Sequence, residues 1–309
     1  MAKQSLRGVV AVVPIPFTTD QSIDEASLRK TADWLGGSGV GGMCLPAYGG
    51  EFYKLSEPER ERVVRIAVEA NHGRVPLLAQ ANHGSSFVAA EMARTYEKIG
   101  ADIISFAIPR MFGTTEADIL QFCRTILDAV SIPVLIQDFN PGGPTIGADF
   151  IEKLHTSHAH FKYVKLEEPM IIDKFNRIHD RMGDKVAILE GWGGYYMLEA
   201  IPVGCVGIMP GTPIWELLDR VVTARVAGRT VEAFDQFASL LPFINFTLQD
   251  FELFLQVEKR LMVRRGLFET AICRELTNTP SDLTLRYIEE LLDYIERLYE
   301  RTDVPFHVG

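Results

Sequence analysis

The stretch HFKYVKLEEP, residues 160–169, has the character of a buried strand that ends in charge. Apolar residues carry the strand, and Pro169 closes it. Residues two apart in a strand point to the same face, so Lys165 and Glu167 are expected to project together. A lysine and a carboxylate at the end of a buried strand are costly to desolvate unless they pair or take part in chemistry. An ordinary ion pair, or a solvated strand end, is the alternative interpretation.

Strand-like apolar segments alternate with helical patterns on both sides of this stretch. Parallel strands covered on both faces read as continuous apolar runs, with helices between them. The pattern predicts an α/β fold, a (β/α)8 TIM barrel. A doubly wound open sheet is the alternative, but no Gly-rich dinucleotide fingerprint follows the first strand. The expected strands are 9–17, 41–46, 75–81, 101–109, 132–139, 161–168, 185–191 and 204–210.

Helix signals fall between these strands and dominate the last third of the chain. Ser56, followed by an acidic first turn and by Glu59, predicts a capping box at a helix start. No linker or low-complexity segment precedes the last helices. We therefore expect a barrel over 1–214 and C-terminal helices over 215–309, packed on the barrel as part of the same functional unit. The expected helices are 23–37, 56–71, 85–99, 116–130, 147–155, 171–182, 195–201, 231–241, 249–266 and 283–301.

The composition excludes several classes of partner. The chain has 309 residues, a formal net charge of -10 and a pI of about 5.3. Phosphate binding needs a positive face, so nucleic acid is not an expected partner. The four cysteines are widely spaced and show no zinc spacing, so no metal is expected. No apolar run is long enough to span a bilayer, and prolines interrupt the apolar N-terminal segment. We expect a protein of the cytoplasm with no membrane partner.

The carboxyl ends of the strands are where a barrel of this kind builds its active site. The sixth strand brings Lys165 and Glu167 there, and the fifth brings Gln137. An amine in a dry pocket is easier to deprotonate, and the neutral amine attacks a ketone. A lysine among these strand ends therefore meets the requirement for Schiff-base catalysis.

Several motifs resemble the dihydrodipicolinate synthase/N-acetylneuraminate lyase family of class I aldolases and dehydratases, over essentially the full length. The turn 47–51 (AYGGE) occupies the position of the family's Gly-Thr-Thr-Gly-Glu turn, and 163–165 that of the strand with the Schiff-base lysine. Residues 189–191 and 206–208 match the last two strands. The resemblance implies that Lys165 forms the iminium, so that no cofactor is needed. It also implies a small 2-keto acid substrate and a homodimer or homotetramer.

The substrate-binding residues follow from the same resemblance. Backbone amides around Tyr48 and Gly49 would hold the substrate carboxylate, with Gly50 in the same turn. Gly191 and Trp192, followed by two more glycines, suggest a loop near the ligand, since glycine permits close backbone approach. Ile208, at the end of the eighth strand, and Arg110, after the fourth, complete the set. Arg110 is placed to meet a distal hydroxyl or carboxylate, and a surface role is the alternative.

Departures from the family pattern concern the proton path. The tyrosine that most members carry on the fifth strand is Gln137 here, which has no titratable proton. In the family that tyrosine relays protons. The second threonine of this proton relay is replaced here by Gly49, and its supporting tyrosine after the fourth strand by Met111. The arginine that usually follows the fifth strand is missing, and Gly142 or its neighbours stand there. The position two after the lysine, small in many members, is Glu167. This combination resembles the branch that contains 2-keto-3-deoxy-L-arabonate dehydratase.

Dehydration of a 2-keto-3-deoxy sugar acid suits this set of residues. An iminium at C2 acidifies the C3 protons, and the C4 hydroxyl leaves when it receives a proton. We interpret Glu167 as the acid/base and Gln137 as a group that orients the substrate. The alternative role for Glu167 is an ion pair that fixes Lys165. Glu51 is expected to cap the turn, and Asp138 to face away from Gln137.

Two other functions remain open at this stage. A pyruvate-releasing class I aldolase would use the same iminium on a 2-keto-3-deoxy sugar acid. A non-catalytic sugar-acid binding protein would have the same barrel without the proton relay. The replacement of the relay's tyrosines by Gln137 and Met111 agrees with this alternative. The aromatic and aliphatic residues of the last helices are interpreted as core or subunit interface.

Overall fold

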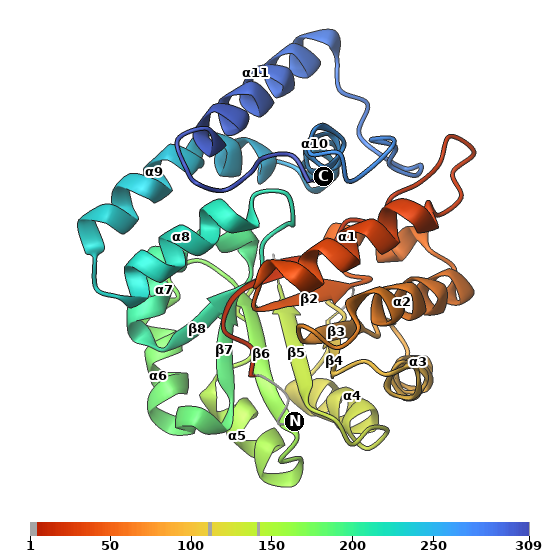
Figure 1. The fold of residues 1–309 in the computed structure, drawn as a ribbon. Coiled ribbons are helices and arrows are strands. Elements are labelled where there is room, and N and C mark those ends of the chain that lie inside the picture. Colours follow the sequence, from red (N-terminus) through yellow and green to blue (C-terminus); the bar gives the residue numbers. More distant parts are fainter. Residues whose placement is uncertain (1–4, 111–112, 141–142, 309) are drawn as a thin grey trace.

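The apolar runs of the sequence form one closed barrel of eight parallel strands in the order β1 to β8, which confirms the predicted fold (Figure 1). The computed structural model describes residues 5–110, 113–140 and 143–308. The strands are β1 Gly8–Val12, β2 Gly42–Leu45, β3 Leu77–Gln80, β4 Ile103–Ala107, β5 Val134–Phe139, β6 Phe161–Glu167, β7 Ala187–Glu190 and β8 Cys205–Ile208.

Most strands are shorter than their apolar runs. Strand β1 was expected over 9–17 and ends at Val12. Pro14 and Pro16 have no N–H to donate to a neighbouring strand, so the paired ladder stops before them. The rest of that run is buried although it is not part of the strand, which is why hydrophobicity alone overestimates the length of the strand.

The helices follow the predicted order, and their starts are locally encoded. Ser56 and Glu59 form the predicted capping box at the start of α2, with both reciprocal hydrogen bonds present. The barrel helices are α1 Glu25–Ser38, α2 Glu57–Asn71, α3 Ser86–Ile99, α4 Glu116–Leu127, α5 Ala148–Ser157, α6 Ile172–Met182, α7 Met197–Ala200 and α8 Trp215–Val226. They are followed by α9 Thr230–Thr247, α10 Phe251–Arg264 and α11 Asp282–Tyr299. Short 3-10 turns lie at 48–50, 52–54, 183–185, 192–194 and 201–203.

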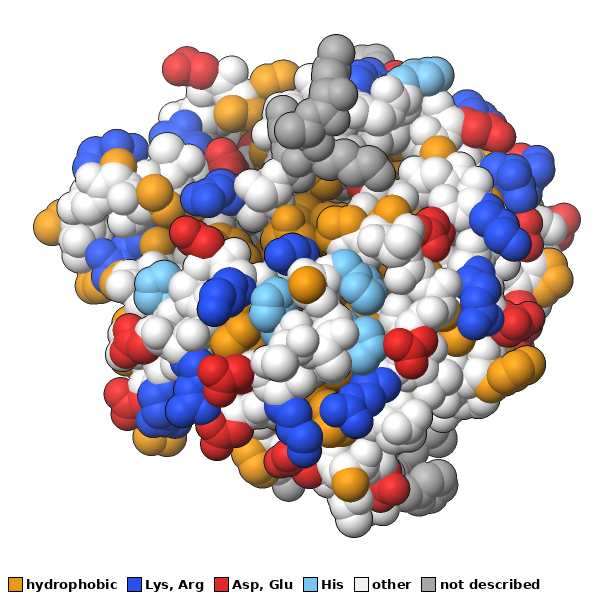
Figure 2. Space-filling view, turned by 90° about the horizontal axis from the view of Figure 1, so that it is seen from below, with side chains coloured by type: hydrophobic (Ala, Val, Ile, Leu, Met, Phe, Trp, Pro, Cys, Tyr) orange, Lys and Arg blue, Asp and Glu red, His pale blue; other side chains and the backbone are white. Residues whose placement is uncertain are grey.

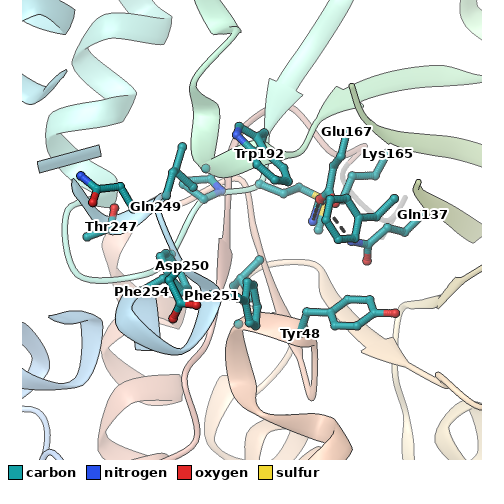
Figure 3. A pocket seen from close by; sticks show the side chains of 18 of the residues that line it. Tyr48, Gln137, Lys165, Glu167, Trp192, Thr247, Gln249, Asp250, Phe251 and Phe254 are labelled. Atoms are coloured by element: carbon teal, nitrogen blue, oxygen red, sulfur yellow. Dashed lines mark hydrogen bonds and ion pairs between the residues drawn. The ribbon is translucent and has the colours of Figure 1, made fainter. Parts of the chain in front are cut away.

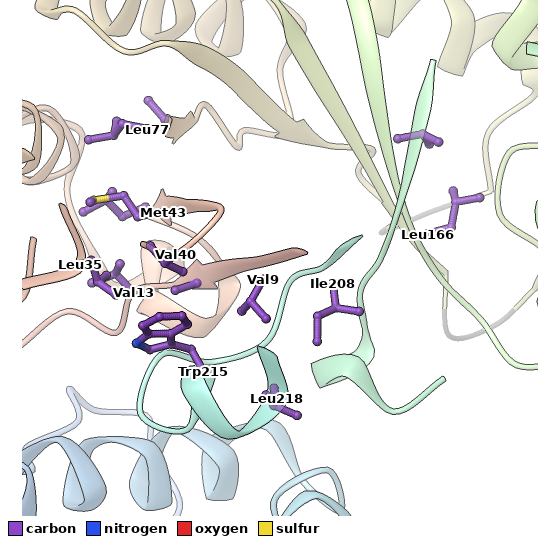
Figure 4. Close-up of a cluster of buried hydrophobic side chains, with 14 of the residues drawn as sticks. Val9, Val13, Leu35, Val40, Met43, Leu77, Leu166, Ile208, Trp215 and Leu218 are labelled. Atoms are coloured by element: carbon purple, nitrogen blue, oxygen red, sulfur yellow. The ribbon is translucent and has the colours of Figure 1, made fainter. Parts of the chain in front are cut away.

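The core has two layers because successive side chains of a strand point to opposite faces. Inside the barrel, Val10, Leu135 and Tyr163 pack together. Outside it, a larger cluster joins the strands to the helices. Figure 4 shows part of that outer cluster, with Val9, Leu166 and Ile208 among its members.

The C-terminal helices lie together on one side of the barrel (Figure 1). The boundary expected at 214 falls just before α8, which follows β8 and packs against β1 as the eighth barrel helix. Arg265, fully buried after α10, joins this helix to the end of the chain. Its guanidinium donates twice to the Glu216 carboxylate, at 2.9 and 2.7 Å, and once to the Phe306 carbonyl at 2.9 Å.

On the face drawn in Figure 2, basic and acidic side chains alternate, with several histidines near its middle. Within the described ranges, no helix has the length and apolar character needed to cross a membrane.

Replacement of Arg265 by methionine is expected to destabilise the fold by about 3–5 kcal/mol, because it leaves the Glu216 carboxylate buried without its partner. Urea and thermal unfolding measure the loss. Arg264→Met is the matched control. Arg264 is partly exposed and pairs with exposed acids, so about 1 kcal/mol or less is expected. Equal losses in the two variants would contradict the role assigned to Arg265.

Candidate active site

A cavity of about 570 Å³ lies at the carboxyl ends of the strands. Figure 3 shows its two ends: Gln137, Lys165 and Glu167 from the barrel at one, and residues of the α9–α10 connection at the other. The barrel side also contributes Val12, Tyr48, Gly49, Tyr53, Phe139, Trp192, Gly193, Met209, Pro210 and Gly211.

Lys165 and Glu167 project into this cavity together, as the strand alternation predicts. Their Nζ and Oε1 atoms are 2.6 Å apart, and Lys165 is only 7% exposed. Residue Gln137 pairs with Lys165 across β5 and β6, and its Nε2 donates to Glu167 Oε1 at 3.1 Å. The Glu167 carboxylate therefore accepts from an ammonium group and from an amide at the same time.

Gln80 completes this network and was not identified from the sequence. It lies on β3 and is buried, and its Nε2 donates to Gln137 Oε1 at 2.7 Å. An amide whose oxygen is occupied in this way must present its NH2 group to Glu167. The sequence does carry a signal: Gln80 is a polar residue at the carboxyl end of an apolar run, two after an inward-facing Leu78.

The buried carboxylate of Glu51, the last residue of the turn after β2, stabilises that turn. Glu51 is fully buried and forms ion pairs with Lys54, at 3.0 Å, and with Lys259 of α10. It also accepts a hydrogen bond from the Arg274 amide at 3.1 Å. Glu51 is not among the residues that line the cavity, so it supports the turn and does not face a ligand.

The turn itself presents Tyr48 and Gly49 to the cavity. Gly50 does not line it; a Cβ at that position would lie 2.8 Å from the Val13 carbonyl oxygen, so glycine allows the turn to pack against the chain after β1. Burial, and then the charge of Glu167, raise the pKa of the Tyr48 phenol. The phenol therefore stays protonated near neutral pH and is a poor base.

Gly191 lies behind Glu167 and is not a lining residue. A Cβ on Gly191 would collide with the Glu167 side chain. Its neighbour Trp192 does line the cavity and packs on Phe139, with ring centroids 5.3 Å apart. The glycine thus leaves space for the carboxylate, and the tryptophan supplies an apolar wall beside it.

Glu190, at the end of β7, is fully buried, and this burial raises its pKa well above the ordinary value. It accepts a hydrogen bond from the Tyr196 amide at 3.4 Å and does not line the cavity. Through this hydrogen bond Glu190 connects the end of β7 to the turn that follows it.

Besides Gly50 and Gly191, two further residues expected to bind the substrate, Arg110 and Ile208, do not line the cavity. Arg110 makes a bidentate pair with the buried Asp138, at 2.9 and 2.6 Å, on the face of β5 opposite Gln137, and it does not line the cavity. Ile208 lies in the outer core, and the next residue, Met209, lines the cavity instead. The register between β7 and β8 shifts at Leu189, which pairs with Gly207 and skips Val206, so simple alternation fails there.

Residues of the C-terminal helices line the far end of the cavity. From the sequence, the aromatic and aliphatic residues of these helices were interpreted as core or subunit interface. The lining residues at this end are Thr247, Leu248, Gln249, Asp250, Phe251 and Phe254. No local signal marks them, because their place depends on how the extension folds over the barrel. Met111 and Gly142, named among the departures, lie outside the described residues. Within the described ranges, no group of three or more His, Cys, Asp or Glu residues is arranged to hold a metal ion.

Comparison with known proteins agrees with this geometry. The sequence profile of the Dihydrodipicolinate synthetase family matches residues 5–292. The chain belongs to this family. It is therefore an enzyme, a lyase of the class I aldolase family, as the sequence predicted.

Relatives within the family include dehydratases. An L-2-keto-3-deoxyarabonate dehydratase of Azospirillum brasilense is 28% identical over 77% of this chain and 79% of that protein. A protein of Bradyrhizobium sp. strain ORS 278, named as a 5-dehydro-4-deoxyglucarate dehydratase, is 28% identical over 62% of this chain and 60% of its own length, less than two thirds. The dihydrodipicolinate synthase of Rhodopseudomonas palustris has the same fold, with a TM-score of 0.87 over 95% of this chain and 100% of that one, at 23% identity.

Gln80→Leu is expected to lower kcat by about 10- to 100-fold, because the Gln137 amide loses the donor that fixes its orientation toward Glu167. Steady-state kinetics measure the loss. Ser105→Ala is the control, since Ser105 is the second and more distant partner of Gln80, at 3.4 Å, and does not reach Gln137. An unchanged kcat in Gln80→Leu would show that Gln137 needs no such support.

Proposed function

We propose that this chain dehydrates a 2-keto-3-deoxy sugar acid, of the 2-keto-3-deoxy-L-arabonate kind, through a covalent iminium on Lys165. The observation that carries the proposal is the Glu167 carboxylate 2.6 Å from Lys165 Nζ, in a cavity where the family's strand-five tyrosine is Gln137. The names of the dehydratase relatives support the same reaction class.

Lys165 is placed for the first step. Its neutral amine attacks the C2 carbonyl, and loss of water gives the iminium. Glu167, the nearest acceptor to Nζ, is placed to take the proton that the ammonium must lose before attack. Glu167 then returns this proton to the hydroxyl of the carbinolamine, which leaves as water, so the iminium forms and the Glu167 carboxylate is restored.

Glu167 serves the second step. Its carboxylate removes a proton from C3, and the C–H electrons form the C2–C3 double bond of an enamine. The protonated acid then gives that proton to the C4 hydroxyl, which leaves as water while the enamine electrons form the C3–C4 double bond. Gln137 donates to the carboxylate before the transfer and holds it beside the reacting carbons.

The substrate carboxylate is assigned to the turn after β2. The amides of Gly50, Glu51 and Phe52 donate to carbonyls within that turn. In the described part of the chain this leaves the amides of Tyr48 and Gly49 for an anion, and both residues line the cavity. Two adjacent amides form a concave donor site of the kind that binds carboxylates.

Glu167→Gln is expected to reduce turnover at least about 1,000-fold, since the amide neither accepts nor returns the C3 proton. The variant keeps Lys165, so borohydride should still trap an adduct with pyruvate at that residue, read by mass spectrometry. Lys165→Ala is the matched control and should yield no adduct. Retained turnover in Glu167→Gln would exclude the acid/base role.

Product identification separates dehydration from aldol cleavage. With 2-keto-3-deoxy-L-arabonate and related pentonates and hexonates, we expect loss of water and no pyruvate in a lactate dehydrogenase coupled assay. Stoichiometric pyruvate would favour the aldolase, and the absence of any adduct at Lys165 would favour a binding protein.

A further inference from the structure

The charges that line the cavity are few and unevenly placed. In the described residues they are Lys165 and Glu167 at one end and Asp250 at the other (Figure 3). Lys165 is paired with Glu167 and, on the proposed function, becomes the iminium. The far end of the cavity therefore carries a negative charge and no positive one.

Among the residues that the structure describes, Lys165 is the only basic residue that lines the cavity. Arg110, the residue expected to meet a distal carboxylate, is held by both oxygens of Asp138. The strand-end residues 111–112 and 141–142, which the structure does not describe, are Met-Phe and Pro-Gly in the sequence, so none of them is basic. The walls between the two ends are largely apolar, with Phe139, Trp192 and Phe254 among them.

Asp250 is fixed at this position by the fold. It is the N-cap of α10, where its Oδ1 accepts from the Leu253 amide at 2.8 Å. The amide end of a helix attracts anions. Here the Asp250 side chain itself occupies one of those amides, that of Leu253, and adds a carboxylate to this end of the cavity.

We propose that the cavity selects 2-oxo acids with a single carboxylate and a neutral, hydroxylated far end, and that Asp250 sets this specificity by rejecting dicarboxylates. The proposal rests on the assignment of Lys165 as the iminium residue. A second carboxylate would be desolvated against apolar walls, without a cation, and would face a like charge. A terminal hydroxyl has no such cost and can donate to the Asp250 carboxylate.

The test compares two six-carbon substrates that differ at the far carbon. One is 2-keto-3-deoxygluconate, which ends in a CH2OH group, and the other is 5-dehydro-4-deoxyglucarate, which ends in a carboxylate. For each we would measure kcat/KM and the concentration that half-saturates borohydride trapping at Lys165. The wild-type chain is expected to favour the monocarboxylate by about tenfold or more in both measurements, and less at high salt.

Two variants address the far end of the cavity. Asp250→Asn keeps a capping acceptor and removes the charge, and should improve trapping of the dicarboxylate, relative to that of the monocarboxylate, by about 3- to 30-fold. Gln249→Lys adds a cation at the same rim without altering the cap, and should act in the same direction. Asp235→Asn, an exposed acid of α9 outside the cavity, is the charge control and should leave the ratio unchanged.

The outcomes separate this proposal from the proposed function. If both substrates trap equally well, or if the ratio is the same in wild type, Asp250→Asn and Gln249→Lys, the selectivity proposal is overturned while the iminium assignment stands. If neither substrate nor pyruvate labels Lys165, the proposed function fails and the selectivity proposal fails with it.

Discussion

A lysine ammonium and a carboxylate lie 2.6 Å apart above the apolar interior of a barrel. Neither ion is stable there alone, because desolvation of a single charge costs far more than a hydrogen bond returns. The surrounding structure satisfies the pair from several directions. Gln137 donates to the carboxylate, Gln80 fixes Gln137, and Gly191 leaves the space that the carboxylate needs. These contacts come from β3, β5, β6 and the end of β7, so the pair depends on how the barrel brings these four strands together.

Much of this arrangement was predictable from the sequence because it follows from periodicity. A strand side-chain period of two places Lys165 and Glu167 on one face, and continuous apolar runs specify parallel strands covered by helices. The capping box at Ser56 is equally local. Such features need no knowledge of distant residues, and the structure contains them as expected.

The residues that the sequence misassigned depend on longer-range geometry. Ile208 was expected at the ligand, but a register shift beside β8 brings Met209 inward instead. Arg110 was expected at a distal group, and its pairing with Asp138 is set by how the fourth and fifth strand ends meet. Asp250 and its neighbours reach the cavity only because the C-terminal helices fold back over the barrel. A local sequence pattern does not predict any of these positions, because each depends on residues that are distant in the sequence.

The buried carboxylate of Glu51 has a consequence for the order in which the enzyme is made. Its partners include Lys259 and the amide of Arg274, which are more than 200 positions further along the chain. All eight strands, which end at Ile208, are therefore synthesised before these two partners of Glu51. A chain that stopped after β8 would lack these two partners and the far wall of the cavity. The residues that complete the candidate site, in α10 and just beyond it, are therefore also the last of its residues to be made.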